Sequence, residues 1–298
     1  ANTPTNGLIE AAEHLTLPRP RPSFAQVDER GGGGMIAVGT VCYRLGELPC
    51  IGMGRSWNAK ELDAAIHGQV SALVFDIQGK ADIEELLAGV VETSFEHEQL
   101  ARALDTPDDV EGWRVGEAIA EAYLTEHRNC MFPWPDSRDE RKSGSSLPGA
   151  DLVGIQRDKQ GDCFVFGEVK TSGEAEYPPS VVYGRTGLKQ QLEDLRDKTS
   201  IRQGLFMYLA HRAKNATWEG RFKAAAKRYI NNNSDVQLFG VLVRDVSPCV
   251  DDVRVRVEKL GKDCPAAMQI ELLALYLPAG AIGNLATQAL ATRAGGDT

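Results

Sequence analysis

The chain has 298 residues, of which 42% are hydrophobic, enough to bury a sizeable core, so the composition excludes an intrinsically disordered protein. Its formal net charge of −9 excludes a uniformly basic surface, but the charge is unevenly distributed: residues 1–110 hold 8 Lys and Arg against 17 Asp and Glu, whereas residues 111–298 hold 25 of each. The acidic first part would repel DNA or meet a protein partner, whereas the neutral second part can still carry a local surface for a polyanion.

Several classes of site find no support in the sequence. The six cysteines form no CxxC pair, which indicates reduced thiols in a cytoplasmic protein without structural zinc. P-loop, HExxH and GxSxG motifs are missing, so we expect no nucleotide cofactor of the chain's own, no histidine-based metal site and no serine-hydrolase chemistry. No apolar stretch is long enough to cross a membrane and the N-terminus lacks the zones of a signal peptide, so we expect a soluble, cytoplasmic protein.

The first part of the chain predicts a small α/β unit after a connector rich in proline and glycine. Its predicted elements are the connector at 17–34, a strand at 35–43, a helix at 59–70, a buried strand at 71–77 and one or two amphipathic helices at 80–105.

The second part begins with an amphipathic helix, predicted from about Val110 to His127, which carries Glu117 and Glu121 one turn apart. A polar stretch rich in Pro, Ser and Gly at 132–149 is expected to be a long surface loop. The elements predicted after it are a hairpin of strands at 150–156 and 162–170, helices at 186–199, 200–214 and 217–230, strands at 236–244, 252–260 and 268–277, and a weak helix or frayed tail from Ala279.

The hairpin carries the pattern that points to chemistry. Residues i and i+2 of a strand face the same side, so Glu168 and Lys170 project together while Val169 enters the opposite face. The partner strand can place Asp151 beside them. Two carboxylates on one face repel each other unless a cation lies between them, and such hard oxygen ligands favour Mg²⁺ or Mn²⁺. A nearby ammonium can then orient or help to deprotonate a water that attacks phosphorus.

In this order of elements, the chain resembles the PD-(D/E)xK nuclease superfamily over about residues 111–245. The resemblance rests on Asp151 in "GADLVG" and on Glu168 and Lys170 in "FGEVK", with Ala150 where the name-giving pattern has proline. It implies an α/β (α+β) fold with a restriction-endonuclease-like core, in which a mixed central sheet is flanked by helices. The predicted domains are then an acidic α/β region at 1–110, suited to partner binding or regulation, and a nuclease-like domain at 111–298.

The resemblance also implies roles for individual residues. Asp151 and Glu168 would bind metal, Lys170 would be the catalytic lysine, and Glu117 in "VGEAIAEAYL" would help to hold the metal or its water. Polar residues that would face the substrate backbone are Gln190 and Gln191, ranked equally, with Lys189 as another candidate. A finer resemblance, to the effector nucleases of Hachiman-type anti-phage systems, implies DNA as substrate and a helicase as protein partner.

Alternatives to each interpretation remain open at this stage. An acid two residues before a lysine is most often a solvated surface pair, and Glu117 and Glu121 can both belong to a hydrated helix face. The basic residues of the stretch 212–228 can follow a phosphate backbone or merely be solvated. A latent or non-catalytic subunit of nuclease fold, acting through a partner, is the alternative to an active enzyme, and a purely structural interaction protein is the third possibility.

Overall fold

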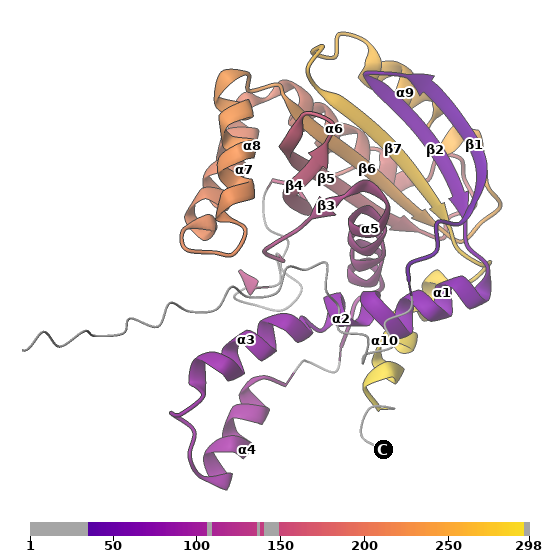
Figure 1. Cartoon of the computed structure of the whole chain (residues 1–298). Helices are drawn as coiled ribbons and strands as arrows, with labels where there is room; N and C mark the ends of the chain where they lie inside the picture. Colours follow the sequence, from indigo (N-terminus) through magenta and orange to yellow (C-terminus); the bar gives the residue numbers. More distant parts are fainter. Residues whose placement is uncertain (1–34, 106–108, 136–137, 140–148, 295–298) are drawn as a thin grey trace, which may run out of the picture. The chain divides into compact units, whose positions relative to one another are not determined.

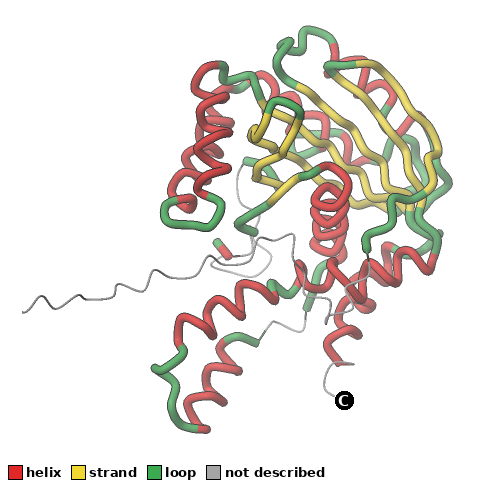
Figure 2. The backbone as a smooth tube through the Cα atoms, viewed as in Figure 1, coloured by secondary structure: helices red, strands yellow, loops and turns green. Residues whose placement is uncertain are grey.

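Seven strands form one mixed β-sheet in the computed structural model of the chain, which describes residues 35–105, 109–135, 138–139 and 149–294 (Figures 1 and 2). The predicted connector at 17–34 and most of the predicted loop at 132–149 lie outside the described residues. In chain order the strands are β1 (Thr40–Glu47), β2 (Cys50–Ser56), β3 (Cys130–Met131), β4 (Leu152–Asp158), β5 (Gly161–Ser172), β6 (Val236–Arg244) and β7 (Gln269–Tyr276).

Across the sheet the strands follow the order β1-β2-β7-β6-β5-β4-β3. The four central strands β2, β7, β6 and β5 run parallel, whereas β1 pairs antiparallel with β2, and β4 pairs antiparallel with β5 and β3. The chain is therefore α/β with a mixed sheet, as predicted at this coarse level.

Helices connect the strands and cover both faces of the sheet. They are α1 (Ala59–Ala65), which continues into the π-helix η1 (Ile66–Val70), α2 (Ser71–Val74), α3 (Ile77–Leu87), α4 (Ser94–Ala103), α5 (Gly112–Arg128), α6 (Leu188–Asp197), α7 (Thr199–Ala213), α8 (Glu219–Asn231), α9 (Arg254–Gly261) and α10 (Leu285–Ala294), with 3₁₀ turns η3 (Ser180–Val182), η4 (Val250–Asp252) and η5 (Ile282–Asn284). Over the described residues, no helix combines the length and apolar character that crossing a bilayer requires.

Two hydrophobic cores lie on opposite faces of the sheet because side chains alternate along each strand. On β5, Val165 and Val169 pack into a core with α5, α1, α2 and α10, whereas Phe164 and Phe166 pack into a second core with α6, α7, α8 and α9. Alternation thus sends Glu168, two residues after Phe166, to the face covered by α6–α9.

Most of the elements predicted in the second part are confirmed, among them the long helix (α5), the β4–β5 hairpin, the three helices α6, α7 and α8, the strands β6 and β7, and a helix in the tail, α10. Two predicted strands are wrong. Residues 71–77 form α2 and the start of α3, because Ser71, Val74 and Phe75 are buried at helical spacing. Residues 252–260 form mainly α9, because Val253, Val257 and Leu260 face the sheet every three to four residues although the letters alternate as in a strand.

The first part of the chain contributes to the same sheet as the second. Its predicted strand at 35–43 begins only at Thr40, and β2, which no sequence pattern indicated, joins β7 in parallel through pairs such as Gly52 with Leu272. The division at residue 110 stays a prediction, and the sheet draws on residues from both sides of it.

Candidate functional site

The β4–β5 hairpin brings the predicted acidic residues together. Leu152 pairs with Gly167, so Asp151, directly before β4, lies beside Glu168. The backbone N–H of Val169 donates a hydrogen bond of 2.8 Å to Asp151 Oδ2, which fixes this carboxylate against the neighbouring strand. One oxygen of Asp151 therefore already has a partner before any ligand is considered.

Lys170 joins the two carboxylates with its ammonium group. Its Nζ lies 2.5 Å from Glu168 Oε1 and 3.8 Å from Asp151 Oδ2. The side chain of Glu168 is only 4% exposed, whereas those of Asp151 and Lys170 are 17% and 23% exposed. The cluster thus has a buried acid at its base and opens to solvent through Asp151 and Lys170.

Burial and mutual repulsion change the ionisation of these groups. Burial, followed by the charge of Asp151, raises the pKa of Glu168 to about 8. Burial also raises the pKa of Asp151, although the Lys170 charge and the Val169 N–H oppose it. For Lys170, burial lowers the pKa, but the charges of Asp151 and Glu168 outweigh burial and raise it. The lysine is therefore a stable cation here, and the cluster holds one more carboxyl group than it can easily ionise.

Glu117 reaches this cluster from α5, on the other side of β5. The helix approaches β5 closely because Gly116 leaves room for Thr171, whose side chain a Cβ at position 116 would meet. Glu117 is half-buried, and its charge contributes to the raised pKa of Lys170. Glu121, one turn on, instead helps to raise the pKa of Arg138, so the structure separates the two helix acids.

The carboxylates of the cluster are the potential donors of a metal site. Nowhere in the part of the chain that the structure describes do three or more His, Cys, Asp or Glu side chains gather in an arrangement that could hold an ion. Asp151 and Glu168 do offer paired carboxylate oxygens, which suit a hard divalent cation, and the Lys170 ammonium lies where positive charge is needed. Of the three predicted ligands, Asp151 and Glu168 thus lie side by side. Glu117 is linked to them only through the effect of its charge on Lys170.

The predicted substrate-binding residues lie on α6, whose first turns pack next to Glu168. Gly240 on β6 pairs with Glu168, and the side chains of Leu188 and Leu192 fill the space above it. Gln191 lies between these leucines in sequence and flanks the sheet-facing side of the helix. Gln190 is the weaker candidate of the two glutamines, because its Nε2 already donates a hydrogen bond of 2.8 Å to Asp194 Oδ1 on its own helix.

Lys189, the remaining substrate-binding candidate, lies on the opposite flank of α6 from Gln191. Its Nζ is 4.0 Å from Glu193 Oε1, one turn along the same helix. The pairing is loose and the lysine side chain is 36% exposed, so it can leave Glu193 for another anion at little cost.

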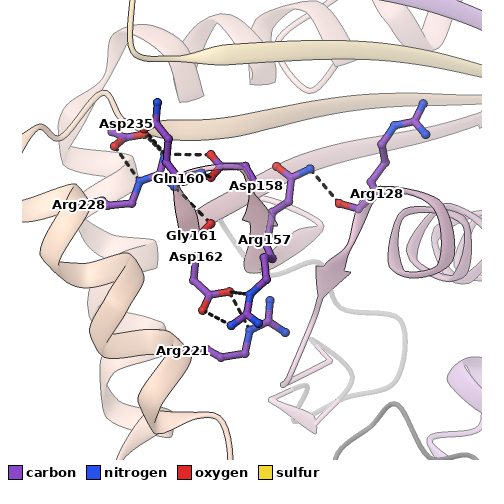
Figure 3. Close-up of polar contacts among 10 residues, drawn as sticks. Arg128, Arg157, Asp158, Gln160, Gly161, Asp162, Arg221, Arg228 and Asp235 are labelled. Carbon is purple, nitrogen blue, oxygen red and sulfur yellow. Dashed lines mark hydrogen bonds and ion pairs between the residues drawn. The ribbon is translucent and has the colours of Figure 1, made fainter.

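The arginines of the basic stretch at 212–228 are bound within the fold. Figure 3 shows Arg221 paired with Asp162, and Arg228 paired with Asp158 and Asp235. The N–O distances of these three ion pairs are 2.7 to 3.0 Å. The cavity beside this network, about 160 Å³ in volume, is lined by Arg228 and other residues of this end of the sheet, and by none of the predicted site residues. These arginines therefore tie α8 to the β4–β5 hairpin.

Two residues that the sequence did not single out lie near the start of α6. The ring of Tyr183 packs over the guanidinium of Arg256, which is buried on α9. No local motif marks this pair, because the two residues are far apart in the chain and residues 252–260 resemble a strand.

Comparison with models of known protein families gave no match, and comparison with curated proteins gave none either.

Proposed function

We propose that the protein is a metal-dependent nuclease that hydrolyses phosphodiester bonds of DNA. The observation that carries the proposal is the cluster of Asp151, Glu168 and Lys170 on adjacent strands, which combines paired carboxyl groups with an ammonium group whose pKa is raised. Further support comes from the order of elements, since α5, the β4–β5 hairpin, α6 and β6 follow the order of the restriction-endonuclease-like core that the sequence resembles.

In this proposal Asp151 and Glu168 hold Mg²⁺, or Mn²⁺ in its place, and Glu117 supports the site from α5. A bound ion of this kind polarises the phosphoryl oxygen and stabilises the charge that develops on it. Because the pKa of Lys170 is raised, the lysine acts as a hydrogen-bond donor that orients the attacking water or the phosphate oxygen, and not as the base. Gln191, beside the sheet-facing stripe of α6, is the better candidate of the two glutamines for a contact with the substrate backbone.

Cleavage of plasmid and linear DNA by the purified protein tests the proposal. We expect cleavage with Mg²⁺ or Mn²⁺, none with EDTA, and loss of cleavage in Asp151→Ala and Lys170→Ala. Glu121→Gln, a change on the same helix as Glu117, is the matched control and should cleave like the wild type. DNA that stays intact under every condition, or a fully active Lys170→Ala variant, would refute the assignment.

A second candidate is a latent nuclease that acts only through a protein partner, such as the helicase that the sequence resemblance implies. One surface favours it: Leu86 of α3, Val90 of the following loop and Phe95 of α4 are 77%, 68% and 68% exposed, among predominantly acidic residues. If this candidate is correct, the isolated chain will leave DNA intact but will cleave it once the partner has loaded. Leu86→Ser with Phe95→Ser would then abolish cleavage by the complex without changing the fold of the isolated chain.

A further inference from the structure

An exposed aromatic ring and a buried arginine meet at the start of α6. Tyr183 directly follows η3 in the loop between β5 and α6 and is 50% exposed. The Arg256 Cζ atom lies 5.7 Å from the centre of the tyrosine ring. The guanidinium thus supports one side of the ring, and half of the tyrosine remains open to solvent.

Arg256 itself is left without the partners that a buried cation needs. The residue is only 6% exposed, and its Nε and Nη1 atoms are buried without a hydrogen-bond partner. No carboxylate among the described residues forms an ion pair with it. A buried charge with unmade hydrogen bonds is costly. Nη2 is not among these buried atoms, so it is the guanidinium atom that an anion from outside the chain can reach.

A second tyrosine–arginine pair joins Tyr177 of the same loop to Arg244 at the end of β6 and has more contacts within the fold. Arg244 lies 5.6 Å from the centre of the Tyr177 ring, but it donates hydrogen bonds to the carbonyls of Ser172 and Glu176 at 3.0 and 2.8 Å. The Tyr177 hydroxyl donates to the Ser247 carbonyl at 2.9 Å. The Arg244 Nε atom has no hydrogen-bond partner, but it lies 3.5 Å from Asp252 Oδ2, so the charge of Arg244 is paired within the fold. Arg256 has neither an ion pair nor a side-chain hydrogen bond among the described residues.

Tyr183 is connected to the candidate catalytic site by direct packing. Gly187, the N-cap of α6, lies against the Tyr183 carbonyl with no room for a side chain. The next residue, Leu188, packs on Gly240, which is the strand partner of Glu168. The loop is also anchored upstream, where Ser180 donates two hydrogen bonds of 2.5 Å to the carboxylate of Glu174.

We propose that Tyr183 and Arg256 form a subsite for one unpaired nucleotide of single-stranded nucleic acid. The base stacks on the open part of the Tyr183 ring, and an adjacent phosphate accepts a hydrogen bond from Arg256 Nη2. An unpaired base is required because a duplex hides its π-faces between neighbouring base pairs. Arg185, two residues after Tyr183, adds positive charge near this tyrosine. Tyr177, in contrast, follows two acidic residues, Glu174 and Glu176. This inference rests on the proposed nuclease function for its setting, but the subsite binds without catalysis.

Fluorescence anisotropy of a labelled oligothymidylate of about 12 nucleotides, measured in EDTA so that nothing is cleaved, tests the subsite. Tyr183→Leu and Arg256→Met should each weaken binding about 5- to 100-fold. Tyr177→Leu is the matched control and should change binding less than about 2-fold. Equal losses in Tyr177→Leu and Tyr183→Leu, or no loss in Tyr183→Leu, would overturn the proposal.

A second readout separates a binding role of Arg256 from a structural one. Because its charge lacks a partner, Arg256→Met should raise the melting temperature of the free protein while it weakens binding. A lower melting temperature would show that the fold itself uses the cation, and would overturn the assignment.

Two further ligands test whether the subsite requires a single strand and not merely a phosphate group. Duplex DNA of the same length and thymidine monophosphate should bind more weakly than the oligonucleotide, and a monophosphate that binds as tightly would contradict a strand-binding site. Oligonucleotide binding should persist in Asp151→Ala. The anisotropy assay can therefore support the subsite even if the cleavage assay shows no nuclease activity.

Discussion

Replacing Glu168 by glutamine should remove most of the pH dependence that the candidate site gives to folding. In the wild type, burial and the Asp151 charge raise the pKa of Glu168 to about 8, well above the ordinary value of 4.5. The folded chain therefore holds a proton that the unfolded chain has already released over this range. Stability contributed by the group is present at low pH and is lost as the pH rises towards 8. Glutamine keeps the shape and the hydrogen-bond donor of the protonated acid but does not titrate.

The size of the effect follows from the width of this window. Each pH unit over which the folded state holds one extra proton costs about 1.4 kcal/mol of unfolding free energy. The ionisation of Glu168 depends on the charges of Asp151 and Lys170, which makes the total change in unfolding free energy smaller than this window alone would give. Between about pH 5.5 and about pH 8.5, we expect the unfolding free energy of Glu168→Gln to gain about 2–4 kcal/mol relative to that of the wild type.

Urea unfolding of both proteins in EDTA, followed by circular dichroism at a series of pH values, measures this difference. Glu121→Gln, which removes an acid from the helix that carries Glu117 and leaves the Asp151–Glu168–Lys170 cluster intact, is the control. Saturating Mg²⁺ should flatten the wild-type curve, because a bound cation favours the ionised carboxylate. Parallel curves for the wild type and Glu168→Gln in EDTA would refute the reasoning, since Glu168 would then have the same pKa in both states.

Three other predictions concern packing, ion pairs and catalysis. Gly116→Ala should destabilise the protein by about 1–3 kcal/mol in urea unfolding, because the new methyl group meets Thr171, whereas Gly204→Ala on the open side of α7 should stabilise it by about 0.5–1 kcal/mol. Arg228→Ala should cost about 1–3 kcal/mol in the same assay and leave Mn²⁺ affinity unchanged, because it breaks two ion pairs remote from the site. Lys170→Met should reduce cleavage at least about 100-fold in single-turnover assays while Mn²⁺ binding persists; an equal loss of both would assign the lysine to metal-site structure alone.

The candidate site could be predicted from the sequence because Asp151, Glu168 and Lys170 lie on one hairpin and close together in the chain. Strand alternation places Glu168 and Lys170 on one face, and a short hairpin turn brings Asp151 beside them. The raised pKa of Glu168 could not be predicted in the same way, since it depends on α6 and its leucines covering Gly240 next to the acid. Burial of this kind is a property of tertiary packing.

The missed strand β2 and the wrongly predicted strand at 252–260 also depend on tertiary packing. Strand β2 contains Gly52 and Gly54, which lack the β-branched side chains that mark a strand, and these glycines are needed because Val257 of α9 and Tyr43 of β1 pack directly on them. The helix α9 resembles a strand in sequence because valine and arginine alternate in it. Only contact with β2 decides that Val253 and Val257 face the same way.

Titration of Mn²⁺ into the purified protein, followed by electron paramagnetic resonance of the free ion, tests most directly whether Asp151 and Glu168 form a divalent-cation site beside Lys170. We expect the wild type to bind the ion more tightly as the pH rises towards 8, and expect Asp151→Asn and Glu168→Gln each to abolish binding while Glu121→Gln retains it. A wild type that leaves all the Mn²⁺ free, or variants of Asp151 and Glu168 that bind it as the wild type does, would contradict the assignment.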